Sequence, residues 1–180
     1  MKISHIITGW LILTGLVITP FAWSDDDTGR YSRRGVAMVD NPLYKNECTS
    51  CHMAYPPGLL PEASWIKLMA GLEDHFGDNA ELDAETHRII KDYLVRNSAD
   101  KSNYRRSQKF ARGYSGNKIL IRISELPYFV HEHDEIPTHM VKGNKDVRSF
   151  SHCNACHRKA DQGSFREREI DIPGYGQWDD

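Results

Sequence analysis

The segment "NECTSCHMAYPPG", residues 46–58, contains two cysteines three positions apart and a histidine directly after the second. A second segment, "SHCNACHRKA" at residues 151–160, repeats this C-x-x-C-H arrangement. Pairs of cysteines at this spacing can bind a metal ion, exchange a disulfide or attach a haem. The fold of the chain depends on which of these chemistries the two motifs serve.

Disulfides and zinc are the ordinary roles to weigh against haem. A bridge between Cys48 and Cys51 would close a tight loop, which is typical of redox motifs and not of structural disulfides. A zinc site built from two such pairs usually has ~15–20 residues between them, whereas 101 residues separate Cys51 from Cys153. Neither role explains why a histidine follows each pair. C-x-x-C-H is the signal for covalent haem attachment, so the sequence predicts two c-type haems.

The spacing suits a haem because residues i and i+3 share one face of a helix, where both thiols can reach one porphyrin. Each thiol adds to a vinyl group to form a thioether, and the adjacent histidine becomes the proximal iron ligand. The predicted attachment residues are Cys48 and Cys51 for the first haem and Cys153 and Cys156 for the second, with His52 and His157 as proximal ligands.

The first 24 residues have the features of a cleaved signal peptide. Lys2 precedes a mostly apolar run at residues 6–17, and Ala-Trp-Ser at 22–24 places small residues where a signal peptidase cuts. We expect cleavage after Ser24 and export of the mature chain. An uncleaved anchor is the alternative, because the apolar run extended to Ala22 approaches the ~17 residues needed to span a bilayer.

The composition limits the class of protein. The net charge of −2 argues against a generic nucleic-acid binder, which would normally be strongly basic. A chain of 180 residues makes one domain or two small ones. Two domains of about 75 residues each would bury little core without a staple, a metal or a cofactor. Both halves are therefore expected to depend on their haems for stability.

Three helices are expected around the first motif. The first begins near Asp40, a possible cap, and carries the cysteines near its far end. The second covers residues 61–75, where apolar residues and His75 recur at a spacing of three and four. The third covers residues 83–97, with Ile90, Tyr93 and Leu94 as its apolar stripe. Such a set forms a compact single-haem domain.

The second half of the chain gives weaker signals. Residues 97–118 are polar and basic, and we interpret them as a solvated linker or as a docking surface for an acidic partner. Alternating isoleucines at 119–123 predict a short strand, and one helix is expected at 153–160. The predicted divisions are a signal peptide at 1–24, a helical haem domain at 25–100, a basic linker at 101–118 and a second haem domain at 119–180.

The ligand opposite each proximal histidine decides whether an iron transfers electrons or binds small molecules. The candidates are His75, His87, Met53 and Met69 for the first haem, and His131, His133, His139, His152 and Met140 for the second. Met53 and His152 adjoin the motifs and are held on the attachment side. In an extended stretch His131 and His133 point to opposite faces, so at most one reaches the ring. Spacing alone does not choose among the others.

The chain resembles the bacterial dihaem cytochrome c family, in which a class I cytochrome c domain precedes a second haem domain. The matching stretches are "YKNECTSCHMAYPPGLLPEASW", "HFGDNAELD", "IIKDYL", "EHDEIP" and "SFSHCNACHRKADQGSF", which with their spacing cover most of residues 40–175. The resemblance implies a mainly α fold, with a class I cytochrome c-like helical domain and a smaller, irregular haem domain containing a short strand. It also implies histidine ligation on both sides of each iron, with His75 and His133 as the distal ligands.

Two functions are consistent with these features of the sequence. In the first, both irons are low-spin and closed, and the protein is a periplasmic electron carrier with no catalytic residue and no small-molecule substrate. The resemblance implies a membrane cytochrome b and a small soluble haem protein as partners. In the second, one iron is open, as in a dihaem peroxidase or a gas sensor, and an acid such as Glu125, Glu132 or Asp134 assists. The number of available histidines favours the electron carrier.

Overall fold

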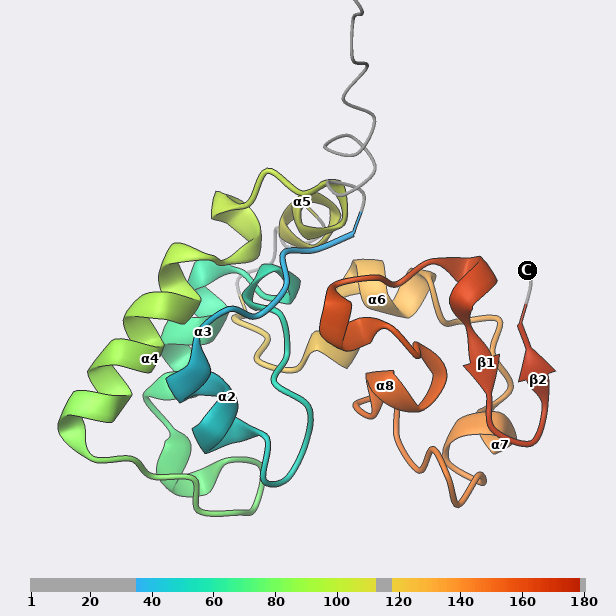
Figure 1. The fold of residues 1–180 in the computed structure, drawn as a ribbon, viewed down its shortest axis with the longest axis horizontal. Coiled ribbons are helices and arrows are strands. Elements are labelled where there is room, and N and C mark those ends of the chain that lie inside the picture. The colour runs from blue at the N-terminus through green and yellow to red at the C-terminus, as the bar shows by residue number, and fades with distance from the viewer. Residues whose placement is uncertain (1–34, 113–117, 179–180) are drawn as a thin grey trace, which may run out of the picture.

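The computed structural model describes residues 35–112 and 118–178, which form two lobes (Figure 1). The first lobe contains α2 (Pro42–Cys48), α3 (Glu62–Met69), α4 (Ala84–Arg96) and α5 (Arg105–Arg112). The second contains α6 (Pro127–His131), α7 (Thr138–Val141), α8 (Cys153–Cys156), β1 (Asp171–Ile172) and β2 (Gly176–Gln177). Single turns of 3₁₀-helix occur at η1 (Pro57–Leu59), η2 (Leu72–Asp74), η3 (Ala99–Lys101), η4 (Ile123–Glu125), η5 (Ala160–Gln162) and η6 (Glu167–Glu169). The expectation of a mainly helical protein with a little strand is confirmed.

The core of the first lobe is built around α4. The Asp83 side chain caps this helix by accepting hydrogen bonds from the amides of Glu85 and Thr86, both at 3.0 Å. The apolar stripe predicted from the sequence is buried, and Ile90 and Leu94 face α3 and the rest of the core. The prediction of a helix near residues 83–97 is therefore confirmed.

The helix predicted at residues 61–75 is shorter in the structure. It ends at Met69, and Gly71 has a non-helical backbone with φ −128° and ψ 35°. Glycine loses more conformational freedom in a helix than other residues do, so it favours a break at this point. His75 consequently lies beyond a separate 3₁₀ turn and not on the apolar face of a continuous helix.

The first motif also differs from its prediction in detail. Asn41, and not Asp40, caps α2 by accepting a hydrogen bond from the Tyr44 amide at 2.8 Å. The helix ends at Cys48, so Cys51 lies in the turn that follows. In the second motif, both cysteines lie in the single turn α8, and the helix predicted at 153–160 gives way to η5.

The basic segment predicted as a solvated linker contains a helix. Helix α5 buries Ser107 and Phe110 against η1, η3 and α6, and it exposes Arg105, Lys109 and Arg112. The expectation of a solvated stretch is therefore wrong for the residues of α5. The division of the chain into two domains stays a prediction.

The strand predicted at residues 119–123 is absent from that stretch, which is extended and then enters η4. Alternating isoleucines need a neighbouring strand to form a sheet, and none of the described residues supplies one here. The small sheet is instead the antiparallel pair β1 and β2, in which Ile172 pairs with Gly176.

The predicted signal peptide, residues 1–24, lies outside the described residues. Between residues 35 and 112 and between 118 and 178, no helix combines the length and hydrophobicity that crossing a bilayer requires.

A backbone contact at Gly163 joins the N-terminal segment to the second lobe and gives the first prediction. The Val36 amide donates to the Gly163 carbonyl at 3.1 Å, and Gly163 has φ +72°. A Cβ atom at this position would collide with the Val36 carbonyl oxygen. We expect Gly163→Ala to lower the free energy of unfolding by about 2–4 kcal/mol, from backbone strain and overpacking together.

Gly174→Ala is the matched control, because Gly174 has φ +80° and an added methyl group there would meet no atom within 4 Å. Gly174→Ala introduces the backbone strain alone, and we expect it to lower the free energy of unfolding by about 1 kcal/mol. Denaturant unfolding followed by circular dichroism measures both values. Equal losses would show that the contact with Val36 does not stabilise the protein.

Candidate functional site: two paired-histidine centres

The first centre lies in the first lobe and brings together the rings of His52 and His75. Their ring centres are 6.2 Å apart, and the ring planes are inclined by 35°. His52 follows α2 and its turn, and its Nδ1 lies 2.7 Å from the Met53 carbonyl oxygen. Because a carbonyl can only accept, Nδ1 carries the proton and the lone pair of the ring is on Nε2.

A tight turn holds His75 in place. The His75 amide donates to the Asp78 carbonyl at 2.7 Å, and Phe76 and Gly77 between them have φ +59° and +104°. The Arg122 guanidinium lies 3.8 Å from the centre of the Phe76 ring, which is within the range of a cation–π contact. Partial burial and the neighbouring His52 lower the pKa of His75, so its imidazole is neutral at pH 7.

The second centre pairs His133 with His157. Their ring centres are 6.1 Å apart, and the planes are inclined by 71°. His133 follows α6, and its Nδ1 lies 2.8 Å from the Phe129 carbonyl oxygen, which again leaves the lone pair of the ring on Nε2. The Phe129 ring stacks on His133 with centres 3.9 Å apart, and Phe150 meets the same imidazole edge-on.

His157 is held by backbone contacts on both sides and by an aromatic ring. Its amide donates to the Cys153 carbonyl at 2.8 Å, its backbone pairs with Ile170, and the Phe165 ring lies 5.2 Å away. Burial, with smaller contributions from His133 and Arg106, lowers the pKa of His157 to about 4. The ring is therefore neutral at pH 7, which is the form that binds a metal.

A cavity of about 520 Å³ surrounds the second pair, within the range of cofactor pockets. Its apolar lining includes Val141, Val147, Phe150, Phe165, Ile170, Ile172 and Trp178. Cys153 and Cys156 open into the same space. The cavity thus combines apolar side chains, two thiols and four imidazoles with charged residues, among them Arg106, Glu132 and Asp134.

The separation of the rings tests whether a haem iron fits between them. Imidazole nitrogens bind metal ions at about 2 Å, and each nitrogen lies ~1 Å from its ring centre, so two rings flanking one ion have centres ~6 Å apart. The observed separations of 6.2 Å and 6.1 Å agree with this value. Both pairs therefore fit one haem iron each.

The other candidate ligands of the first centre point elsewhere. Met69 is buried in the core with 4% of its surface exposed. The His87 ring is engaged by the Met69 carbonyl, which lies 2.8 Å from Nε2. Met53 adjoins His52 and supplies the carbonyl that its ring contacts.

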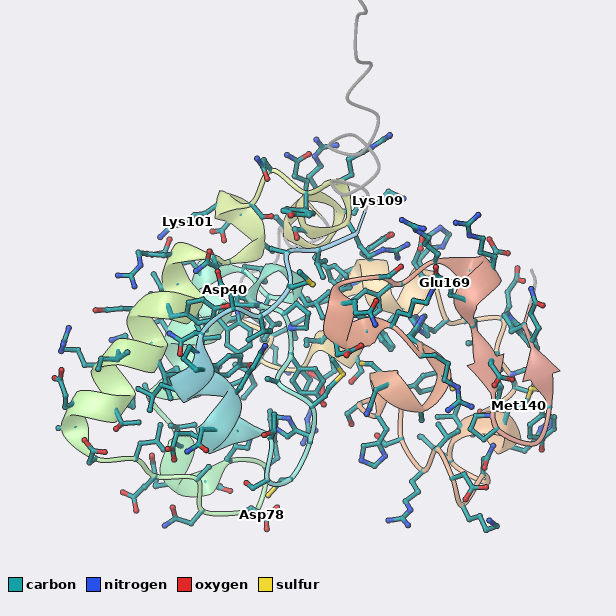
Figure 2. All side chains as sticks on the ribbon, in the orientation of Figure 1. Asp40, Asp78, Lys101, Lys109, Met140 and Glu169 are labelled. Atoms are coloured by element: carbon teal, nitrogen blue, oxygen red, sulfur yellow. The ribbon has the colours of Figure 1, made fainter. Side chains whose placement is uncertain are left out.

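The alternatives at the second centre are exposed or have other contacts, although His131 and His152 also line its cavity. His131 and His139 are exposed, and His139 contacts the Tyr175 ring. The Nδ1 atom of His152 lies 2.7 Å from the Val147 carbonyl oxygen. Met140 lies at the outer edge of the second lobe (Figure 2). Of the candidates named from the sequence, His133 is the one whose ring is paired with His157.

The cysteines do not have the properties of a disulfide exchanger. None of the four forms a disulfide. Burial raises the pKa of both Cys48 and Cys153 to about 11, whereas reactive C-x-x-C motifs have a lowered thiol pKa. In the described part of the chain, no group of three or more His, Cys, Asp or Glu side chains is arranged to hold a metal ion.

The two motifs share a second cavity, of about 630 Å³. The first motif contributes Thr49, Ser50, Cys51, His52 and Met53, and the second contributes Ser151, His152, Asn154 and Ala155. The attachment segments therefore face one another across a common space, although about a hundred residues separate them in the sequence.

Several residues around the imidazoles were not identified from the sequence. They are Tyr55 at the first centre, Phe129, Phe150 and Phe165 at the second, and Arg122 over Phe76. Phe129 could have been found, since it lies four residues before His133, the spacing at which side chains of a helical turn meet. The others meet their partners only through the tertiary fold.

The comparisons with known proteins identify the family of the chain. A family model described as dihaem cytochrome c matches residues 44–165. A dihaem cytochrome c from Shewanella baltica OS155 is 42% identical, with a TM-score of 0.65, over 79% of this chain and 100% of the other. A dihaem cytochrome c from Rhodobacter sphaeroides is 44% identical, with a TM-score of 0.64, over 72% of this chain and 100% of the other. None of the curated proteins compared shows a significant match. The chain therefore belongs to the dihaem cytochrome c family and carries two c-type haems.

Proposed function

We propose that this protein is a periplasmic electron carrier in which two histidines close each haem iron. The proposed ligands are His52 and His75 for the first iron and His157 and His133 for the second. The proposed attachment residues are Cys48, Cys51, Cys153 and Cys156. The single observation that carries the proposal is the ~6 Å separation of the two imidazole centres in each pair, which leaves room for one ion and no further ligand.

The bound haems supply reversible one-electron chemistry at iron, and the chain's own residues keep other reactions out. Main-chain carbonyls fix the tautomers of His52 and His133, so that each presents a lone pair at Nε2. Phe129, Phe150 and Phe165 shield the second pair from water. Because thioether ligands favour ferrous iron, paired histidines give lower reduction potentials than a histidine–methionine pair.

Two of the three acids named for a peroxidase are engaged in other contacts, whereas the third, Asp134, lines the cavity around His133 and His157. Glu132 accepts hydrogen bonds from Arg106 at 3.3 Å and from the Tyr128 hydroxyl at 3.0 Å. Glu125 lies 3.7 Å from the Arg122 guanidinium. These contacts support the carrier over a peroxidase, in which a distal acid or base must be available to peroxide.

Stopped-flow spectroscopy tests the function directly. We expect the reduced protein to pass electrons to an oxidised soluble cytochrome, and to give no peroxide turnover above that of free haem. Turnover with peroxide that depends on either iron would replace the electron carrier with the peroxidase.

The proposed partners are a membrane cytochrome b and a small soluble haem protein. Helix α5 offers a docking surface for an acidic partner, because Arg105, Lys109 and Arg112 recur on its exposed side. Figure 2 shows Lys109 at the upper edge of the molecule.

Export is supported by the signal-peptide features of the sequence, which also support the periplasm as the location.

Reversing one charge on α5 tests the docking surface. We expect Arg105→Glu to slow electron exchange with an acidic cytochrome several-fold at low ionic strength, because steering by opposite charge is lost. The difference should shrink as salt is added. Lys142→Glu, at the C-cap of α7, makes the same charge change in the other lobe and should leave the rate near that of the wild type. Equal effects of the two variants would remove α5 as the docking site.

A further inference from the structure

A hydrogen bond joins the two attachment segments directly. The Tyr55 hydroxyl donates to the Ser151 carbonyl at 2.7 Å, across 96 positions of sequence. Tyr55 lies three residues after His52, and Ser151 lies two residues before Cys153. The bond therefore links a residue of the first haem segment to the segment that enters the second motif.

The Tyr55 ring also contacts the proposed proximal ligand of the first haem. Its centre lies 4.7 Å from that of the His52 imidazole, with the planes inclined by 27°, so the rings stack. One side chain thus touches the first iron's ligand with its ring and the second haem's segment with its hydroxyl.

The position of Tyr55 is itself fixed by the core of the first lobe. Its carbonyl accepts a hydrogen bond from the Tyr44 hydroxyl at 3.0 Å. Tyr44 belongs to α2 and is 3% exposed. Because α2 ends at Cys48, the same helix positions both the first cysteine and the backbone of Tyr55.

We propose that Tyr55 is a positioning residue for electron exchange between the two haems. Its ring fixes the orientation of the His52 imidazole, and its hydroxyl fixes the approach of the second attachment segment. In the exchange, one electron leaves ferrous iron at one centre and reduces ferric iron at the other, with no proton moved and no bond broken. Tyr55 stays protonated and is not oxidised. This proposal rests on the proposed function, because it assigns a residue to electron transfer inside the carrier.

Two substitutions separate the contributions of the hydroxyl and the ring. Tyr55→Phe keeps the stack on His52 and removes the hydrogen bond to Ser151. Tyr55→Leu removes both. Tyr175→Phe is the control, since Tyr175 is an exposed tyrosine of the C-terminal hairpin that contacts His139 and neither motif.

The measurements use the full-length protein with both haems, verified by denaturing mass spectrometry. After pulsed one-electron reduction, we expect Tyr55→Phe to slow exchange between the haems several-fold, with both reduction potentials unchanged. Tyr55→Leu should slow it further. Electron paramagnetic resonance of the oxidised protein should then show a shifted low-field signal for the first haem alone, because this signal reports the relative orientation of the two axial imidazoles.

The outcomes distinguish this proposal from the proposed function. Wild-type exchange rates in Tyr55→Phe would overturn the assignment of Tyr55, and an unchanged first-haem signal in Tyr55→Leu would remove its role in orienting His52. Both results can be obtained in a protein that still exchanges electrons with its partners. Peroxide turnover by the wild type would overturn the carrier function instead, while the resonance comparison would still decide whether Tyr55 orients His52.

Discussion

Replacing both thiols of the second motif, in Cys153→Ala/Cys156→Ala, is expected to unfold the second lobe. This lobe has few regular elements, and its buried apolar residues are Leu126, Phe129, Val141, Val147, Ala160 and Ile172. Several further apolar side chains, Ile136, Phe150, Phe165, Ile170 and Trp178, line the cavity around His133 and His157. Losing a large aromatic side chain from a core costs about 3–5 kcal/mol, and the haem is larger, so its loss is comparable to the stability of a small domain.

Hydrogen exchange with mass spectrometry measures this effect segment by segment. We expect amide protection to be lost from α8, β1 and β2, and to be retained in α3 and α4. Cys48→Ala/Cys51→Ala is the matched variant in the first lobe, where a larger buried cluster packs around Ile90 and Leu94. It should keep the protection of α4, so the dependence on haem that the sequence led us to expect of both halves is retained here for the second lobe alone. Protection of β1 and β2 in the variant of the second motif would contradict the dependence of this lobe on its haem.

The next largest effect is expected from His75→Ala, which should open the first iron. Removing one of two imidazoles that lie 6.2 Å apart leaves a coordination position that the other candidate ligands are not placed to fill. Met69 cannot substitute without leaving the core, and the His87 ring is held at the Met69 carbonyl. The oxidised variant should show a high-spin component, and the reduced variant should bind one carbon monoxide per protein.

The controls for this variant are the candidates that the structure places elsewhere. Met69→Leu conserves volume, costs little stability and should leave the low-spin spectrum unchanged. His133→Ala should open the second iron in the same way, whereas His131→Ala and His139→Ala should have no effect on the spectrum. A high-spin signal from Met69→Leu, with none from His75→Ala, would reverse the assignment at the first centre.

The sequence predicted most reliably the elements that local signals specify. Helix α4 has a capping aspartate at its start and a 3.6-residue apolar stripe, and both act within a few residues of the chain. The second helix is shorter than its sequence predicts, because the apolar spacing continues through Gly71 into η2. The spacing of apolar residues does not indicate where a helix breaks. Helix α5 was missed because Ser107 and Phe110 are its buried residues, a small apolar signal within a strongly basic stretch.

The strand predicted at 119–123 shows a different limit. Alternation of apolar residues describes one segment, but a strand needs a partner strand, and that partner depends on tertiary structure.

The distal histidines show the same limit for the candidate site. Residue spacing left His131, His133 and His139 open, and the family resemblance favoured His133. In the structure, the hydrogen bond from His133 to the Phe129 carbonyl and the stack with the Phe129 ring place this imidazole opposite His157.

The same reasoning explains why the contacts around Tyr55 could not be predicted from the sequence. Its hydroxyl meets Ser151 across 96 positions, and its ring stacks on His52 through the irregular backbone of residues 53–56. Residue type identified the haem chemistry, while the arrangement of the two haem segments depends on the packing between the lobes.

The closure of both irons is tested most directly by a spectroscopic redox titration of the wild-type protein, with and without carbon monoxide. A ligand that binds only the reduced iron raises the midpoint potential, by an amount that grows with the logarithm of its concentration above the dissociation constant. With His75 and His133 in place, we expect two midpoints that carbon monoxide leaves unchanged at neutral pH, and a low-spin spectrum throughout. A raised midpoint at either haem, with stoichiometric carbon monoxide binding, would contradict the closed carrier and favour a protein with an open iron.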